Sequence, residues 1–360
     1  MKVEERNTGA RYYVNAKLER AKIAKEDDFL DLVKGAEVNK LLTDLIEVNA
    51  KGFRGVVVTA IVGMQINPKY DPLNNFYACN PRSIFEEGIW YALTENAIPC
   101  GKSDPLNVAK NINQLDEAWA TGRRPQSAAM AAVKFLRLVV QSKGKRREHL
   151  IDYFFYKLFC YAQSLGSHIL APAESSGSSN RQLAEKLVRF SLNFPESGNI
   201  PQYLIAKLIE EIYFSSPIKV CGGDESVFGT NTTSKKPADI WTELDGQPIN
   251  LYEVTVKKVN LKRLDDCIDA LRTMNSLDMP VTFICRIPED TSELNLNNGV
   301  LKYKGKIFDF IDIREFINTT SSLLMPDQLT QVINMLENFT SDINISLKTK
   351  EGWNSVFGSK

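Results

Sequence analysis

The sequence predicts an α/β protein in which a mixed β-sheet is flanked by helices and follows a largely helical N-terminal part. Helical spacing of apolar residues dominates the first half of the chain. In the second half, two segments rich in β-branched and aromatic residues flank a turn sequence, DGQP, at 245–248. The later segments continue the order α, β, β, α, β, β, α, which is typical of a mixed sheet with helices on its faces.

Length and composition narrow the class of protein. The chain has 360 residues, more than one average domain. Its longest apolar runs fall short of the roughly 20 residues that span a bilayer, and its N-terminus has no signal-peptide pattern. The six cysteines form no CxxC pair and there are only two histidines, so reduced thiols are expected rather than a zinc cluster. We expect a cytoplasmic protein with no membrane partner.

The overall charge does not by itself indicate nucleic-acid binding, because Lys plus Arg equals Asp plus Glu at 44 each. Local clusters of basic residues are the remaining indication of nucleic-acid binding. Each cluster taken alone is also typical of an ordinary solvated surface. They lie at 122–124, 143–147, 234–236 and 257–263.

The N-terminal half is expected to be helical. Apolar spacing predicts a helix over 27–49, and the run around Val56–Val62 fits either a buried strand or a helix core. Three further helices are predicted at 126–142, 148–165 and 181–193. The small polar residues of 171–180 are typical of a linker. We therefore expect a helical region at 1–170, a linker at 171–180 and a second folded core at 181–360.

The core elements are predicted from short patterns. A helix follows Pro201, segment 218–238 is polar and loop-like, and a strand pair surrounds the DGQP turn. Then come a helix at 261–274, a strand at 280–287, and a strand that enters a helix at 305–317.

Two carboxylates in the strand pair carry the chemical hypothesis. Glu253 lies in an apolar strand, where an unpaired carboxylate is costly, so a metal or a lysine partner is expected. Asp239 begins the preceding strand and can converge with it across the turn. Mg²⁺ is commonly held by one or two carboxylates. Lys257, four residues after Glu253, is expected on the same face, with Thr255 between them. The alternative is that these acids are ordinary surface residues of a hairpin.

These residues resemble a known signature. Pro237-Ala238-Asp239 with Glu253-Val254-Thr255-Val256-Lys257 is similar to the motif of the PD-(D/E)XK nucleases, and the resemblance covers roughly 200–320. The stretch 80–125, which begins NPRSI, resembles Type II restriction endonucleases of the SacI-like group. The superfamily usually has its lysine two residues after the glutamate, where this chain has Thr255. Lys257, or else Lys236 or Lys258, would then supply the base.

The resemblance implies a PD-(D/E)XK nuclease-like core and a Type II site-specific deoxyribonuclease of a restriction-modification system. Such an enzyme hydrolyses phosphodiester bonds of double-stranded DNA with Mg²⁺ and is expected to act as a homodimer. Asp239 and Glu253 would bind the metal, and Lys257 would orient or activate water. Glu210 or Glu211 is either a third acid or a solvated helix residue. The alternatives are a repair or recombination nuclease of the same fold and a non-catalytic DNA-binding protein on a degenerate core.

Polar and basic residues of the N-terminal half are candidates for reading DNA, because Arg and Lys recognise guanine and Asn recognises adenine. The candidates are Arg82, Lys102, Ser103, Asn107, Lys110, Asn111, Arg123 and Arg124. Lys235 and Lys236, just before Asp239, are expected to contact phosphate. The alternative for the segment around 103 is a capped, solvated helix start, with Ser103 or Asp104 as N-cap and Pro105 at the first position.

Overall fold

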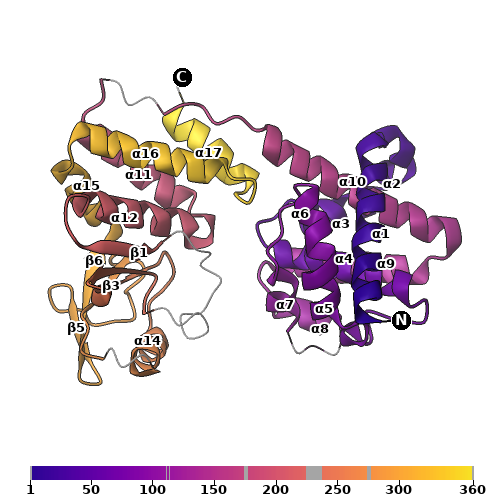
Figure 1. The fold of residues 1–360 in the computed structure, drawn as a ribbon, viewed down its shortest axis with the longest axis horizontal. Coiled ribbons are helices and arrows are strands. Elements are labelled where there is room, and N and C mark those ends of the chain that lie inside the picture. Colours follow the sequence, from indigo (N-terminus) through magenta and orange to yellow (C-terminus); the bar gives the residue numbers. More distant parts are fainter. Residues whose placement is uncertain are drawn as a thin grey trace. The chain divides into compact units, whose positions relative to one another are not determined.

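The computed structural model describes residues 2–110, 112, 114–173, 177–223, 237–273 and 277–358. The chain divides into two compact units, Met1–His168 and Ile169–Lys360. The first is helical, and the second combines a six-stranded mixed sheet with helices (Figure 1). The α/β class expected from the sequence is confirmed, including its helical N-terminal part.

The N-terminal unit is built around one buried helix. Its helices are α1 (Val3–Ile23), α2 (Leu30–Lys34), α3 (Ala36–Ile46), α4 (Lys51–Ile66), α5 (Pro81–Ile84), α6 (Trp90–Glu95), α7 (Asp104–Ala109), α8 (Glu117–Thr121), α9 (Gln126–Gln141) and α10 (Gly144–Ser167). A π-helical turn, Phe85–Ile89, joins α5 to α6. Every residue of α4 from Gly52 to Met64 is buried, and α1, α3, α7 and α9 pack around it. The run around Val56–Val62 is therefore a helix core, because a helix surrounded by other helices is apolar on all sides.

None of the helices in the described ranges combines the length and apolar composition needed to cross a membrane.

The C-terminal unit contains the sheet. Its strands are β1 (Lys219–Gly222), β2 (Ile240–Leu244), β3 (Gln247–Val254), β4 (Val281–Cys285), β5 (Val300–Tyr303) and β6 (Lys306–Asp312). Its helices are α11 (Asn180–Asn193), α12 (Asn199–Ile212), α14 (Leu261–Thr273), α15 (Ile313–Leu323), α16 (Pro326–Ser341) and α17 (Leu347–Phe357).

The strand order is β1-β2-β3-β4-β6-β5. The strands β3, β4 and β6 run parallel, whereas β1, β2 and β5 each pair antiparallel with a neighbour. Asp245 and Gly246 both have positive φ, 52° and 76°, which is what a two-residue hairpin turn requires. The expectation of a loop over 218–238 is wrong for its first part, because 219–222 forms β1 at the sheet edge.

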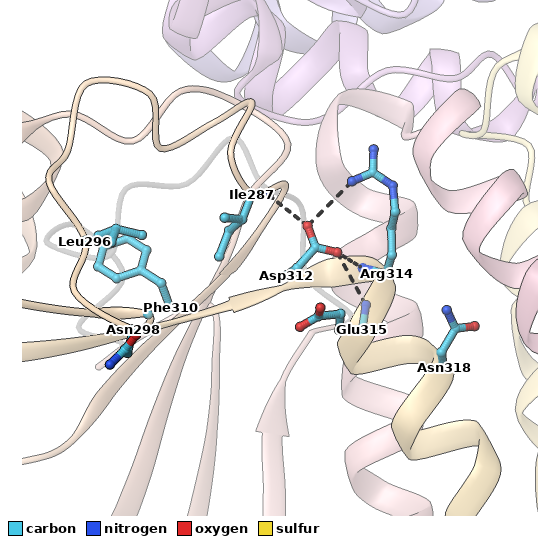
Figure 2. A pocket seen from close by; sticks show the side chains of 9 residues that line it. Ile287, Leu296, Asn298, Phe310, Asp312, Arg314, Glu315 and Asn318 are labelled. Carbon is cyan, nitrogen blue, oxygen red and sulfur yellow. Dashed lines mark hydrogen bonds and ion pairs between the residues drawn. The ribbon is translucent and has the colours of Figure 1, made fainter.

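The junction between β6 and α15 is held by one carboxylate. Asp312 accepts hydrogen bonds from the backbone N–H groups of Arg314 and Glu315, and so caps α15. Its Oδ2 also accepts from the backbone N–H of Ile287 at 2.8 Å (Figure 2). The strand-into-helix pattern predicted for 305–317 is confirmed.

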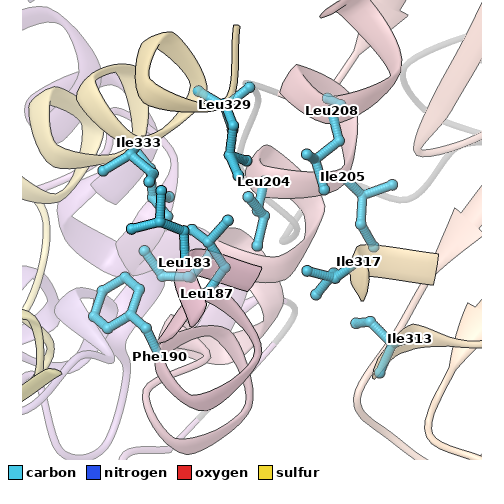
Figure 3. Packing of buried hydrophobic residues seen from close by; sticks show 14 of the residues in the cluster. Leu183, Leu187, Phe190, Leu204, Ile205, Leu208, Ile313, Ile317, Leu329 and Ile333 are labelled. Atoms are coloured by element: carbon cyan, nitrogen blue, oxygen red, sulfur yellow. The ribbon is translucent and has the colours of Figure 1, made fainter. Parts of the chain in front are cut away.

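Two separate apolar clusters cover the two faces of the sheet. On one face, Val254 and Ile284 pack with residues of α11, α12, α15, α16 and α17, and Figure 3 shows Leu204, Ile205 and Leu208 of α12 in that cluster. On the other face, Leu251 and Phe283 pack against residues of α14 such as Leu264 and Ile268. Side chains alternate along a strand, so Glu253 shares the face of Leu251 and is directed toward α14.

The segment expected to be a linker starts as part of the C-terminal unit. The backbone N–H of Ala171 donates to Asn354 Oδ1 at 2.7 Å, and Trp353 Nε1 donates to the Ala171 carbonyl at 2.9 Å. Ala171 thus lies against α17, the backbone N–H of Ala173 donates to Glu337 Oε2 of α16 at 3.3 Å, and 174–176 fall outside the described residues.

Candidate active site

The β2–β3 hairpin brings Asp239 and Glu253 together. Ile240 of β2 pairs with Tyr252 of β3 in the antiparallel ladder. Continuing this register by one residue places Asp239 opposite Glu253. Asp239 Oδ2 accepts a hydrogen bond from the backbone N–H of Val254 at 3.1 Å. This bond fixes the aspartate beside the end of β3. The proximity of the two carboxylates expected from the sequence therefore follows from the register of one hairpin.

The backbone around Asp239 is packed closely enough to hold it in place. The Asp239 carbonyl accepts from the backbone N–H of Gly223 at 3.1 Å. A Cβ atom on Gly222 would lie 2.3 Å from the same carbonyl oxygen, and Gly222 has φ +80°. Only glycine fits this close approach at this backbone conformation without strain. The end of β1 is thus part of what positions the aspartate.

Glu253 is buried and lies beside an arginine that sequence reasoning did not identify. Its side chain is 8% exposed, and Arg263 Nη2 lies 3.4 Å from Glu253 Oε2. Arg263 Nη1 lies 3.4 Å from Thr255 Oγ1, so the guanidinium bridges the two residues. Arg263 belongs to the first turn of α14, where Asn260 Oδ1 accepts its backbone N–H at 3.1 Å. A buried carboxylate needs a cationic partner, and within the described residues this one is an arginine of α14, where the sequence led us to expect a metal or a lysine.

The charges on this face of the sheet are close enough to influence a neighbouring thiol. Burial, followed by the negative charges of Glu253 and Asp239, raises the pKa of Cys267 to about 12. Cys267 lies one helical turn after Arg263 on α14, so the helix directs both side chains toward the same face. A group with this pKa is a neutral thiol at physiological pH.

The structure ends β3 at Val254, so strand alternation does not extend to Lys257. Thr255 is buried, and its Oγ1 accepts the backbone N–H of Lys257 at 3.1 Å. Lys257 and Lys258 are exposed in the segment that follows, and Lys258 Nζ lies 3.4 Å from Glu293 Oε1. The catalytic role expected for Lys257 remains a prediction.

The candidate third acids have structural surroundings of their own. Glu210 Oε1 and Oε2 accept from Lys207 Nζ at 2.8 and 2.9 Å. Glu211 is buried, and its carbonyl accepts from Gln328 Nε2 of α16. Within the described ranges, no group of three or more His, Cys, Asp or Glu side chains is arranged to hold a metal ion. The pair Asp239 and Glu253 nevertheless fits Mg²⁺, which commonly takes one or two carboxylates and leaves its other positions to water and phosphate.

The residues predicted to read DNA lie mainly around α7 and α8 of the N-terminal unit. Ser103, Asn107, Lys110 and Arg124 are exposed. The alternative expected for this segment has support too, because Ser103 is the N-cap residue of α7 and Pro105 lies in its first turn. Pro105 suits a helix start whether or not DNA binds there, whereas the Ser103 side chain makes no capping hydrogen bond.

Three of the other basic candidates have acidic or aromatic neighbours. Arg82 lies 4.0 Å from Glu86, and Lys102 lies 3.4 Å from Glu87 and above the ring of Trp90. The Arg123 guanidinium lies above the ring of Trp119. Asn111, Lys235 and Lys236 lie outside the described residues. The basic candidates that the structure describes lie on the N-terminal unit, and their role in DNA binding stays a prediction.

A cavity of about 710 Å³ lies elsewhere on the C-terminal unit, near the end of β6 (Figure 2). Its lining includes Leu296, Phe310, Asp312 and Arg314, and it includes neither Asp239 nor Glu253. The guanidinium of Arg314 is paired with Glu289 at 2.8 Å. The cavity is therefore not the place where the two carboxylates meet.

No family model matches the chain, and a search of the curated proteins finds no match. Functional inference therefore depends on the chemistry of the residues themselves.

Proposed function

We propose that this protein is a Mg²⁺-dependent, sequence-specific double-stranded DNA endonuclease of the Type II restriction type. The observation that carries the proposal is the pairing of Asp239 and Glu253 at one end of the β2–β3 hairpin, on the face covered by α14. The order α12, β1, β2, β3, α14, β4 also has the α-β-β-α-β arrangement through which the sequence resembles PD-(D/E)XK nucleases, with β1 as one additional strand.

The residues present suit phosphodiester hydrolysis. Asp239 and Glu253 would hold Mg²⁺, and the chemistry that Mg²⁺ supplies there is stabilisation of negative charge on the phosphate oxygens. Burial of Glu253 restricts its rotamers, and the bond from Val254 N–H restricts Asp239, so both ligands are preorganised. Lys257, next to the end of β3, would orient or activate the attacking water. Exposed basic residues of the N-terminal unit would contact DNA, and a homodimer would match the symmetry of a palindromic site.

A second candidate function is a non-catalytic DNA-binding protein on a nuclease-like core. One observation favours it: the position where the superfamily usually has its lysine is Thr255, and Arg263 occupies the space beside Glu253. A repair or recombination nuclease of the same fold would keep the same two carboxylates. It would prefer branched or damaged DNA to an intact plasmid.

The test is cleavage of plasmid and phage DNA in Mg²⁺, with the ends mapped by sequencing. Discrete bands that share one sequence at their ends are expected. Asp239→Asn and Glu253→Gln keep the size and hydrogen-bonding shape of each side chain, and should lower the cleavage rate by about 10²-fold or more. DNA affinity should remain, because each variant removes a negative charge that repels phosphate.

Asp245→Asn is the matched control, because Asp245 is exposed in the turn at the opposite end of the same hairpin. Its left-handed conformation suits asparagine. Full cleavage by the variants at 239 and 253 would rule out this site. Retardation of duplex DNA without any cutting by the wild type would favour the non-catalytic alternative.

A further inference from the structure

We propose that Arg263 is the phosphate-facing cation of this site, and that in the metal-free protein it serves as the counter-ion of Glu253. The inference rests on the proposed function, because it assigns a role within the same site. Arg263 is not proposed as a metal ligand, because Asp239 and Glu253 would still hold the Mg²⁺. It adds a positive charge delivered by α14 to the place beside Thr255 where the nuclease motif would have a lysine.

The geometry of Arg263 differs from that of a purely structural arginine in the same unit. Arg286 binds Asp290 through two hydrogen bonds of 2.9 and 2.7 Å, and the Asp290 side chain is 2% exposed. Arg263 instead divides its guanidinium between two acceptors, each at 3.4 Å, which is longer than the usual N–H···O separation. The two arginine side chains are equally exposed, at 32%, so the difference between them lies in their hydrogen bonds. Arg263 is therefore held loosely and reaches solvent, where a phosphate would approach.

The positive charge of Arg263 is unfavourable at the start of α14, and phosphate binding would account for its presence there. It lies in the first turn of the helix, where no acidic residue occurs and where the helix dipole disfavours cations. An anion such as phosphate would be attracted at this place both by the guanidinium and by the backbone N–H groups at the start of the helix. An arginine beside a buried carboxylate is satisfied in the absence of DNA and available when the carboxylate gains another cation.

Competition for Glu253 gives the proposal its measurable consequence. A metal bound by Asp239 and Glu253 and the guanidinium of Arg263 both neutralise the same carboxylate, so each weakens the binding of the other. Removal of Arg263 should therefore tighten metal binding and, at the same time, slow cleavage. A residue that only supports the fold would weaken both, because the loss of structure would displace the ligands.

The experiment compares wild type, Arg263→Ala and Arg263→Lys by titration with Mn²⁺ alone, without DNA, and by plasmid cleavage. We expect Arg263→Ala to bind Mn²⁺ about tenfold more tightly and to cleave about 10²-fold more slowly. Arg263→Lys keeps the charge and should lie between Arg263→Ala and wild type in both measurements. Arg272→Ala, an exposed arginine of the same helix paired with Asp269, is the control and should match wild type.

Circular dichroism melting separates folding from function. If Arg263→Ala does not fold, the same two measurements on Arg263→Lys decide, with smaller changes in the same directions expected. Weaker Mn²⁺ binding, or cleavage equal to wild type, in a folded variant would overturn the role of Arg263 and leave the proposed nuclease intact. A wild type that neither binds Mn²⁺ nor cleaves DNA would instead refute the proposed function, and with it this inference.

Discussion

Lys257 and Arg263 are both basic residues near Glu253, but their side chains can do different chemistry. A lysine ammonium can lose its proton and then act on water, whereas a guanidinium stays protonated in proteins and acts through charge alone. Arg263 is directed toward Glu253 by α14, and Lys257 is exposed just beyond the end of β3. The two roles that a hydrolytic site needs, a positive charge and an acceptor for a proton, can thus be divided between them.

This division predicts the behaviour of Lys257→Ala. The cleavage rate should fall by about 10²- to 10⁴-fold, the contribution typical of a general acid or base. DNA affinity should stay nearly constant, as measured by gel retardation in Ca²⁺. Lys304→Ala is the control, because Lys304 is an exposed lysine of the same unit that is paired with Asp265. Equal losses in the two variants would show that Lys257 contributes only surface charge.

At the scale of elements, the site depends on the way β1 closes against β2. Gly222→Ala tests this, because the new methyl group would meet the Asp239 carbonyl at 2.3 Å in a backbone conformation of φ +80°. Gly246→Ala is the matched variant: Gly246 has φ +76°, and its Cβ would meet nothing within 4 Å. The left-handed conformation alone costs an alanine roughly 1–2 kcal/mol.

Gly222→Ala should therefore lower the free energy of unfolding by more than Gly246→Ala does, and it should also slow cleavage by displacing Asp239. Thermal unfolding followed by circular dichroism and a plasmid-cleavage assay measure the two effects. If both variants lose the same stability and keep the same cleavage rate, the end of β1 does not position the aspartate.

The sequence predicted the elements whose pattern is local, and it missed what depends on contacts between distant segments. The DGQP turn predicted the β2–β3 hairpin, because Asp-Gly suits two successive residues with positive φ. β1 was missed because it has only four residues, none of them fully buried, at the edge of the sheet. Arg263 was missed because its partner is set by the packing of α14 across β3. The apolar stripe of Leu264, Ile268 and Leu271 was the one local signal for that packing.

For the whole molecule, the zero net charge conceals an uneven distribution between the two units. Basic residues outnumber acidic residues in Met1–His168, and the reverse holds in Ile169–Lys360. A net negative charge suits metal binding by the C-terminal unit, where the active site is proposed, and a net positive charge suits attraction of a polyanion by the N-terminal unit. The overall balance that removed the simplest argument for nucleic-acid binding is therefore the sum of two units of opposite net charge.

Salt dependence measures that attraction directly. Each lysine or arginine that contacts phosphate releases counterions, so the logarithm of the DNA-binding constant falls linearly with the logarithm of salt concentration, by roughly 0.9 per contact. We expect a steep negative slope for the wild type, and a slope shallower by about two for Lys110→Ala/Arg124→Ala. Both residues are exposed in the N-terminal unit.

Lys34→Ala is the control. Lys34 is an exposed lysine of α2, so its removal takes away charge elsewhere on the N-terminal unit and should leave the slope unchanged. If the three proteins share one slope and cut the same sequences, Lys110 and Arg124 do not contact DNA. If Lys110→Ala/Arg124→Ala keeps the wild-type slope but cuts at additional sequences, these two side chains contact base edges instead of phosphates, because base contacts specify sequence without releasing counterions.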